Sequence, residues 1–146
     1  MRITAATLDN LDKLTPMFIH YRELYGAMPQ PEASKDFLRE RLTKQETIIL
    51  LAFEDETLLG FCLVYPSFSS VSLRPMWILN DLYVAETARR KQVASQLLKA
   101  IAKQARDNNA VRLRVSISAS NEIAQSLYEA AEFSEDQNFR SYILPL

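Results

Sequence analysis

Three cationic side chains stand together between a predicted strand and a predicted helix. They are Arg89, Arg90 and Lys91, and the segment continues through Gln92, Val93, Ala94 and Ser95. The first amides of a helix lack intrahelical acceptors and lie at the positive end of the helix dipole, so they can bind a pyrophosphate. A solvated basic turn is the alternative interpretation of the same charges. The strand before the segment and the helix after it favour a phosphate site.

A second candidate site lies in a predicted helix nearer the end of the chain. Asn121 and Tyr128 are spaced so that both side chains can face a common cleft, while Ala124, Leu127 and Ala131 share a face with Tyr128. An Asn helix cap and a core tyrosine are the alternative interpretation. The presence of this segment, in this order after the basic one, further favours the phosphate site.

The composition limits the class of protein. The chain has 146 residues, 48% hydrophobic and 24% charged, with a net charge of −1. This is typical of one globular domain, residues 1–146, with no general affinity for nucleic acid. The single cysteine leaves no disulfide within the chain, and no long apolar run predicts a membrane helix. We therefore expect a cytoplasmic protein without nucleic-acid or membrane partners.

The hydrophobic periodicity predicts alternating strands and helices. In the first half we expect a strand at Arg2–Ala6, a helix at Asp9–Tyr25, a helix at Glu32–Leu42, and a hairpin of Thr47–Glu54 and Leu58–Tyr65. The first helix starts either at an Asp9 cap or at Thr15-Pro16. Pro66–Pro75 is rich in serine and predicts a loop.

The second half repeats this alternation. We expect a strand at Met76–Val84, a helix at Ala94–Asn108, a strand at Val111–Ile117, a helix at Asn121–Ala131, and one or two strands within Phe133–Leu146. The order of elements predicts an α+β domain without repeats or linkers.

The two segments together resemble the GNAT N-acetyltransferases. The family pattern of Arg or Gln, two residues, Gly, one residue, then Gly or Ala matches Arg89 and Ala94, but Gln92 replaces the usual glycine. Gln92 therefore implies either an ordinary helical φ or weaker carrier binding. The second pattern matches Asn121, Ala124 and Tyr128, and Glu132-Phe133 replaces Gly-Phe.

The resemblance implies a fold and a reaction. It implies a single mixed, mostly antiparallel twisted sheet of six to seven strands, flanked by about four helices and splayed between Met76–Val84 and Val111–Ile117. Acetyl-CoA would be the cosubstrate, a small-molecule amine would attack the thioester directly, and no metal would be needed. The residues implied to bind the carrier are Leu82, Tyr83, Val84, Arg89, Arg90, Lys91, Gln92, Val93, Ala94, Ser95, Asn121 and Tyr128. Amides near Leu82–Val84 would polarise the acetyl carbonyl, and Tyr128 would protonate the departing thiolate.

The acceptor side resembles the diamine acetyltransferase branch. There Glu-Asp is common where this chain has Asn80 and Asp81, so Asp81 is the nearest candidate for the general base, directly or through water. An exposed strand carboxylate is the alternative interpretation of Asp81. Tyr21, Glu23 and Tyr25 would border the amine together with Asn80, although surface packing explains them equally well.

Two other reactive residue types have simpler interpretations. His20 has no second ligand at metal-binding spacing, and Cys62 lies among aliphatic strand residues as a buried hydrophobe. A coenzyme A-binding or sensor module of the same fold, without efficient transfer, is the alternative function. A homodimer formed through Phe139–Leu146 is a further expectation, unless that segment completes its own sheet.

Overall fold

The computed structural model describes the whole chain, Met1–Leu146, and consists of two compact units. The N-terminal unit is Met1–Ser116 and the C-terminal unit is Ile117–Leu146, and each is described by itself.

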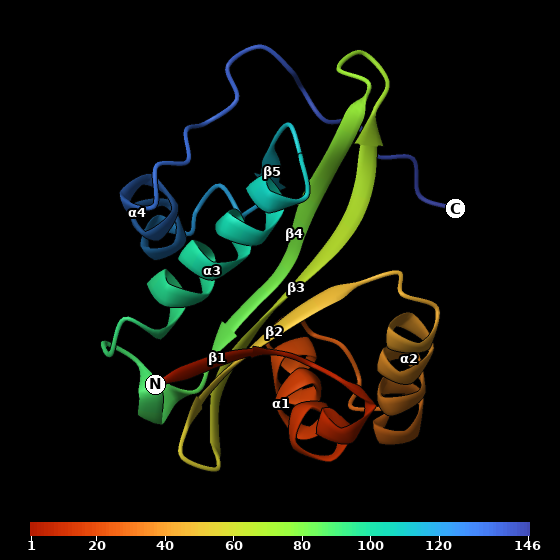
Figure 1. Ribbon diagram of the computed structural model, residues 1–146, viewed down its shortest axis with the longest axis vertical. Coiled ribbons are helices and arrows are strands. Elements are labelled where there is room, and N and C mark those ends of the chain that lie inside the picture. Colours follow the sequence, from red (N-terminus) through yellow and green to blue (C-terminus); the bar gives the residue numbers. More distant parts are fainter. The chain divides into compact units, whose positions relative to one another are not determined.

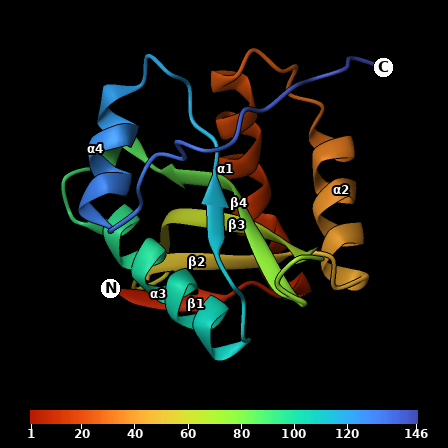
Figure 2. The same ribbon diagram turned by 90° about the horizontal axis from the view of Figure 1, so that it is seen from above.

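A five-stranded sheet forms the centre of the N-terminal unit (Figures 1 and 2). Its strands are β1 (Arg2–Ala5), β2 (Ile48–Glu54), β3 (Thr57–Ser69), β4 (Arg74–Val84) and β5 (Leu113–Val115), in the order β1-β2-β3-β4-β5. The first three pairs are antiparallel and β4 pairs with β5 in parallel. The predicted α+β class and mixed, mostly antiparallel sheet are confirmed. The predicted number of six to seven strands is wrong.

The chain has four α-helices, as predicted. In the N-terminal unit they are α1 (Leu11–Leu24), α2 (Pro31–Thr43) and α3 (Val93–Asp107), and the C-terminal unit contains α4 (Glu122–Ala130). Neither predicted start of the first helix is correct. Thr7 caps a short 3-10 turn, Leu8–Asn10, in a reciprocal capping box with Asn10, and α1 continues from it with Pro16 inside the helix.

The core of the N-terminal unit has two layers because side chains alternate along each strand. Ile49, Leu51 and Phe53 of β2 pack in one cluster with Leu14 and Phe18 of α1 and Leu38 of α2. On the opposite face, α3 contacts β2, β3 and β4 with buried Leu97, Leu98 and Ile101. Figure 1 shows α3 on one side of the sheet and α1 and α2 on the other. Each fully buried leucine contributes on the order of 2 kcal/mol.

The predicted loop Pro66–Pro75 is instead mostly the end of a long hairpin. β3 continues to Ser69, β4 begins at Arg74, and Pro66 pairs with Trp77. The pairing of β2 with β3 ends at Ile48 and Val64, so no strand lies on that side of Pro66. A proline is tolerated there because no partner requires its missing N–H group.

The predicted strands within Phe133–Leu146 are also absent. The last helix ends at Ala130 and no strand follows it. The apolar side chains of this segment are exposed, at 77% for Phe139, 88% for Ile143 and 80% for Leu144. A strand needs a partner strand to satisfy its backbone hydrogen-bonding groups, and no strand of the sheet pairs with this segment.

Candidate active site

A β-bulge in β4 defines the site. Asp81 pairs with Leu63, but the next pair joins Leu79 to Val64, so Asn80 is an extra residue without a partner on β3. A bulge of one residue reverses the face on which the following side chains lie. Leu63 belongs to the cluster with α1, so its partner Asp81 is turned toward α1 as well.

The Asp81 carboxylate is buried beneath α1 and accepts hydrogen bonds there. Only 7% of the residue is exposed, which excludes the alternative of an exposed strand carboxylate. The side-chain nitrogen of Asn80 donates to Asp81 Oδ1 at 3.1 Å, and the Tyr21 hydroxyl is a second donor. Burial raises the pKa of Asp81 above its usual range, and both donors act against that rise. A carboxylate whose pKa is raised in this way is a stronger base than a solvated aspartate.

Aromatic side chains surround this carboxylate. The Tyr21 ring lies 5.8 Å from the Phe61 ring, 6.2 Å from the Tyr83 ring and 5.1 Å from the Tyr25 ring. Tyr65 on β3 faces the same charge, since its pKa is raised first by burial and then by Asp81. Sequence reasoning missed Tyr65, because only the strand register, which pairs the nearby Leu63 with Asp81, reveals its proximity.

The predicted acceptor residues are thus brought together only in part. Tyr21, Asn80 and Asp81 form one hydrogen-bonded group. Tyr25 is joined to it through the Tyr21 ring and is 76% exposed. Glu23 is exposed on α1 and is not among the hydrogen-bond partners of Asp81.

Beyond the bulge, one edge of β4 has no strand partner. The parallel pairing with β5 covers only Trp77 to Leu79 and ends at Val115, although the sequence predicted a strand over Val111–Ile117. The backbone of Asn80–Val84, including the predicted Leu82, Tyr83 and Val84, is therefore free on this edge to hydrogen-bond an extended ligand.

The segment after β4 leads to a helix start without a side-chain cap. Gln92 is the N-cap residue of α3 with φ 60° and ψ 20°, a left-handed conformation, which excludes the first of its two alternatives, an ordinary helical φ. Arg90 also has a positive φ, of 63°. The amides of Val93, Ala94 and Ser95 open the helix, and no side chain caps them.

The predicted basic group flanks these amides. Arg89, Arg90 and Lys91 are all exposed, and Lys91 Nζ is 3.9 Å from the Glu54 carboxylate, a long ion pair. The donors, the charges and the open edge of β4 belong to one unit and fit a ligand that carries a diphosphate and an amide-containing arm.

The C-terminal unit holds the second predicted motif. Asn121 caps α4 by accepting from the Ala124 amide at 3.0 Å. Tyr128 is buried, and its ring lies 5.3 Å from that of Phe133. Glu132 has φ 69°, so it keeps the left-handed conformation expected of the glycine it replaces. Within this unit both residues have the structural roles of cap and packed tyrosine, and their roles toward a carrier stay predictions.

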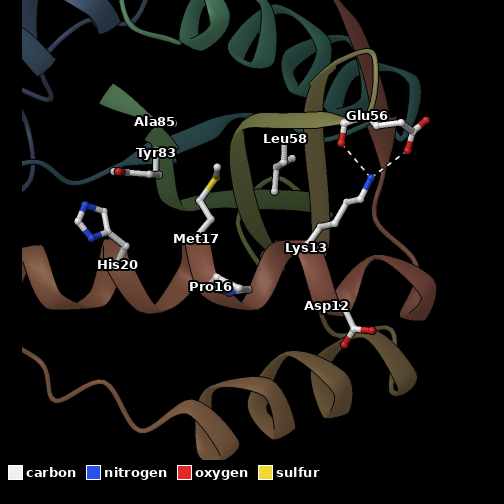
Figure 3. A pocket seen from close by; sticks show the side chains of 9 residues that line it. All are labelled: Asp12, Lys13, Pro16, Met17, His20, Glu56, Leu58, Tyr83 and Ala85. Atoms are coloured by element: carbon white, nitrogen blue, oxygen red, sulfur yellow. Dashed lines mark hydrogen bonds and ion pairs between the residues drawn. The ribbon is translucent and has the colours of Figure 1, made fainter. Parts of the chain in front are cut away.

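A pocket of about 490 Å³ opens between α1, the start of β3 and the end of β4 (Figure 3). Met17, Leu58 and Tyr83 form its apolar wall, and the Lys13–Glu56 ion pair closes one end at 2.9 Å. At the other end the His20 ring lies 5.8 Å from the Tyr83 ring. His20 thus contacts an aromatic wall, a position that the sequence did not indicate.

No group of three or more His, Cys, Asp or Glu side chains is arranged to hold a metal ion, and none of the helices is both long and apolar enough to cross a membrane. Burial raises the pKa of the Cys62 thiol to about 12, as expected of a core residue rather than a nucleophile.

Comparison with known proteins identifies the family. The model of the acetyltransferase (GNAT) family matches residues 14–133. An uncharacterized N-acetyltransferase of Bacillus subtilis, YhfO, is 38% identical over 144 residues, which are 99% of this chain and 97% of that protein. A probable acetyltransferase of Haemophilus influenzae is 31% identical over 99 residues, 67% of this chain and 68% of that protein.

A solved structure agrees with these relatives. The crystal structure of a probable acetyltransferase has 55% sequence identity and a TM-score of 0.96, and the similarity covers 100% of this chain and 98% of that one. The named relatives do not favour the alternative of a binding module without transfer, and none of them is named as a diamine or polyamine enzyme. The expected fold is confirmed, with five strands in its sheet, and the chain is an acyl-CoA-dependent acetyltransferase that belongs to the GNAT family.

Proposed function

We propose that the chain transfers the acetyl group of acetyl-CoA to a primary amine of a small molecule, by direct attack in a ternary complex. The observation that carries this proposal is the bulge at Asn80, which sets the buried Asp81 beside the stretch of β4 that has no strand partner. A proton acceptor and an unpaired backbone edge that can bind an extended ligand thereby share one strand.

The carrier would lie along the open edge of β4. Its diphosphate would meet the amides of Val93, Ala94 and Ser95, with Arg89, Arg90 and Lys91 supplying charge. Amides of the segment Leu82–Val84 would donate to the acetyl carbonyl oxygen as it gains negative charge. The thioester supplies an activated acyl group, and the chain supplies its orientation.

Asp81 would act on the acceptor. An alkylamine with a pKa near 10.4 loses its proton at pH 7 at a cost of about 4 to 5 kcal/mol. A buried carboxylate that accepts this proton, directly or through a water molecule, lowers that cost as the nitrogen attacks. Tyr128 would donate a proton to the thiolate that leaves.

We take a diamine or polyamine as the first acceptor class to test, since a carboxylate among aromatic rings suits a compact ammonium group. The test is release of free thiol from acetyl-CoA with a panel of amines, alongside calorimetry with acetyl-CoA alone. Release with at least one small amine supports the proposal. Binding without release across the panel supports the module that binds without transfer, and no binding of acetyl-CoA rejects both functions.

We also propose that the chain forms a homodimer through the exposed segment Phe139–Leu146. Its apolar side chains lack cover in this chain, and no strand of the sheet pairs with this segment, so it suits pairing with a second copy. Light scattering should give the mass of two chains, and that of one chain after removal of this segment. The mass of one chain for the full-length protein would reject the dimer.

A further inference from the structure

Tyr21 reaches Asp81 from a different element and is held in place by a pair of aromatic residues. Its ring lies 5.8 Å from the Phe61 ring and 6.2 Å from the Tyr83 ring, and Phe61 and Tyr83 are register partners on β3 and β4. The Tyr21 hydroxyl meets Asp81, which belongs to the next register pair on the same face. The phenol is therefore positioned by packing and not only by its hydrogen bond.

Few groups stabilise the negative charge of Asp81. Tyr21 faces it from α1, Asn80 from β4 and Tyr65 from β3, and Asp81 forms no ion pair. Arg41 acts on Tyr65 and not on Asp81. Two neutral donors thus oppose only part of the effect of burial on this carboxylate. Tyr21 remains a protonated donor because burial and the Asp81 charge raise the pKa of its hydroxyl.

We propose that Tyr21 is a positioning residue for Asp81. The Tyr21 hydroxyl keeps the Asp81 carboxylate ionised and fixed in place, so that the carboxylate can act as the base that deprotonates the acceptor amine. This inference rests on the proposed function. As the amine nitrogen forms its bond to the acetyl carbon, its proton passes to an Asp81 oxygen. The carbon–sulfur bond breaks, and the thiolate takes a proton from Tyr128. Tyr21 keeps its own proton throughout, so it acts through Asp81 alone.

The test is the pH dependence of kcat/KM for wild type and Tyr21→Phe with one accepted amine. Removal of the Tyr21 hydroxyl leaves Asp81 with one hydrogen-bond donor fewer, so its pKa should rise. The acid limb of the kcat/KM profile should therefore move to higher pH. Because a hydrogen bond to a charged group is lost, kcat/KM of Tyr21→Phe at pH 6 should be about tenfold lower than that of wild type. This difference should diminish as the pH rises. Tyr65→Phe is the matched control because it removes a hydroxyl that faces Asp81 without donating to it, and its limb should stay in place. A Tyr21→Phe limb that coincides with wild type overturns the inference.

A second measurement is independent of turnover. Carbon-13 NMR of labelled aspartate carboxyl groups follows each titration, and the signal lost in Asp81→Asn identifies Asp81. The inference predicts a titration at higher pH in Tyr21→Phe than in wild type. Identical titrations overturn it, whether or not any amine reacts. A shifted titration in a chain that acetylates no amine supports the effect of Tyr21 on Asp81 and rejects the proposed function instead.

Discussion

The side-chain nitrogen of Asn80 donates a 3.1 Å hydrogen bond to the carboxylate of Asp81, its neighbour in β4. Consecutive strand residues normally point to opposite faces, so this contact between neighbours reflects the bulge that Asn80 creates. The Asn80 amide thereby supports the negative charge of Asp81.

Asn80→Asp should therefore move the acid limb of kcat/KM to higher pH. The change replaces a donor to Asp81 by a like charge, which adds to the rise in the Asp81 pKa that burial already causes. The ionised fraction of Asp81 at pH 6 should fall, and kcat/KM at that pH should fall severalfold. Asn80→Ser retains a hydroxyl donor and is the matched control. An acid limb at lower pH than in wild type would contradict this prediction.

Gln92→Gly should stabilise the protein. Gln92 has φ 60°, a conformation that costs a residue with a Cβ atom about 1 kcal/mol and glycine very little. Glycine also gives the unfolded chain more conformational entropy, which removes part of this gain. The free energy of unfolding, measured by urea denaturation, should therefore rise by about 0.5 kcal/mol. Gln96→Gly, at an exposed interior position of α3, should instead lower it by about 0.5 to 1 kcal/mol. Destabilisation by both changes would indicate that the Gln92 side chain contributes contacts of its own.

Arg89→Gln should weaken acetyl-CoA binding. Arg89 is exposed beside the uncapped start of α3, where each phosphate contact from a partly solvated cation is worth about 1 kcal/mol. Calorimetry should show a Kd about fivefold higher and a weaker dependence on salt, since screening acts on exposed charges. Lys99→Gln removes an exposed charge farther along α3 and should leave the Kd unchanged. Equal losses in both variants would indicate only a general electrostatic effect.

Tyr128→Phe should lower kcat and leave the Kd for acetyl-CoA nearly unchanged. The ring packing against Phe133 survives the substitution, while the proton that we propose for the leaving thiolate is lost. General acid catalysis typically contributes about a hundredfold or more. Tyr142→Phe removes a hydroxyl from a residue that is 88% exposed and is the control. A kcat equal to wild type would remove Tyr128 from the mechanism.

The sequence predicted much of the architecture because its apolar periodicity is strong. The buried positions of α3, Val93, Leu97, Leu98, Ile101 and Ala105, have helical spacing, and strands β2 and β4 are nearly continuous in apolar residues. Local composition misled at Pro66–Pro75, where strand pairing and the absence of a neighbour beside Pro66 outweigh the preference of serine and proline for loops. It also misled at the C-terminus, where an apolar run alone does not supply the partner that a strand needs.

The site was predictable only where local sequence determines it. The start of α3 follows from the basic residues and the helical pattern after them. The bulge at Asn80 does not, because register depends on the pairing of β3 with β4 across the hairpin. Consequently the burial of Asp81, its contact with Tyr21 and the proximity of Tyr65 emerge only from the folded chain.

The most direct test of the account is the pH profile of thiol release by Asp81→Asn beside wild type, with one accepted amine and saturating acetyl-CoA. If Asp81 is the base, wild type loses activity as Asp81 gains a proton at low pH, and the variant has a much lower rate without that limb. The Kd for acetyl-CoA, measured by calorimetry, should be the same in both proteins. A variant with the wild-type rate and an unaltered profile would contradict the account.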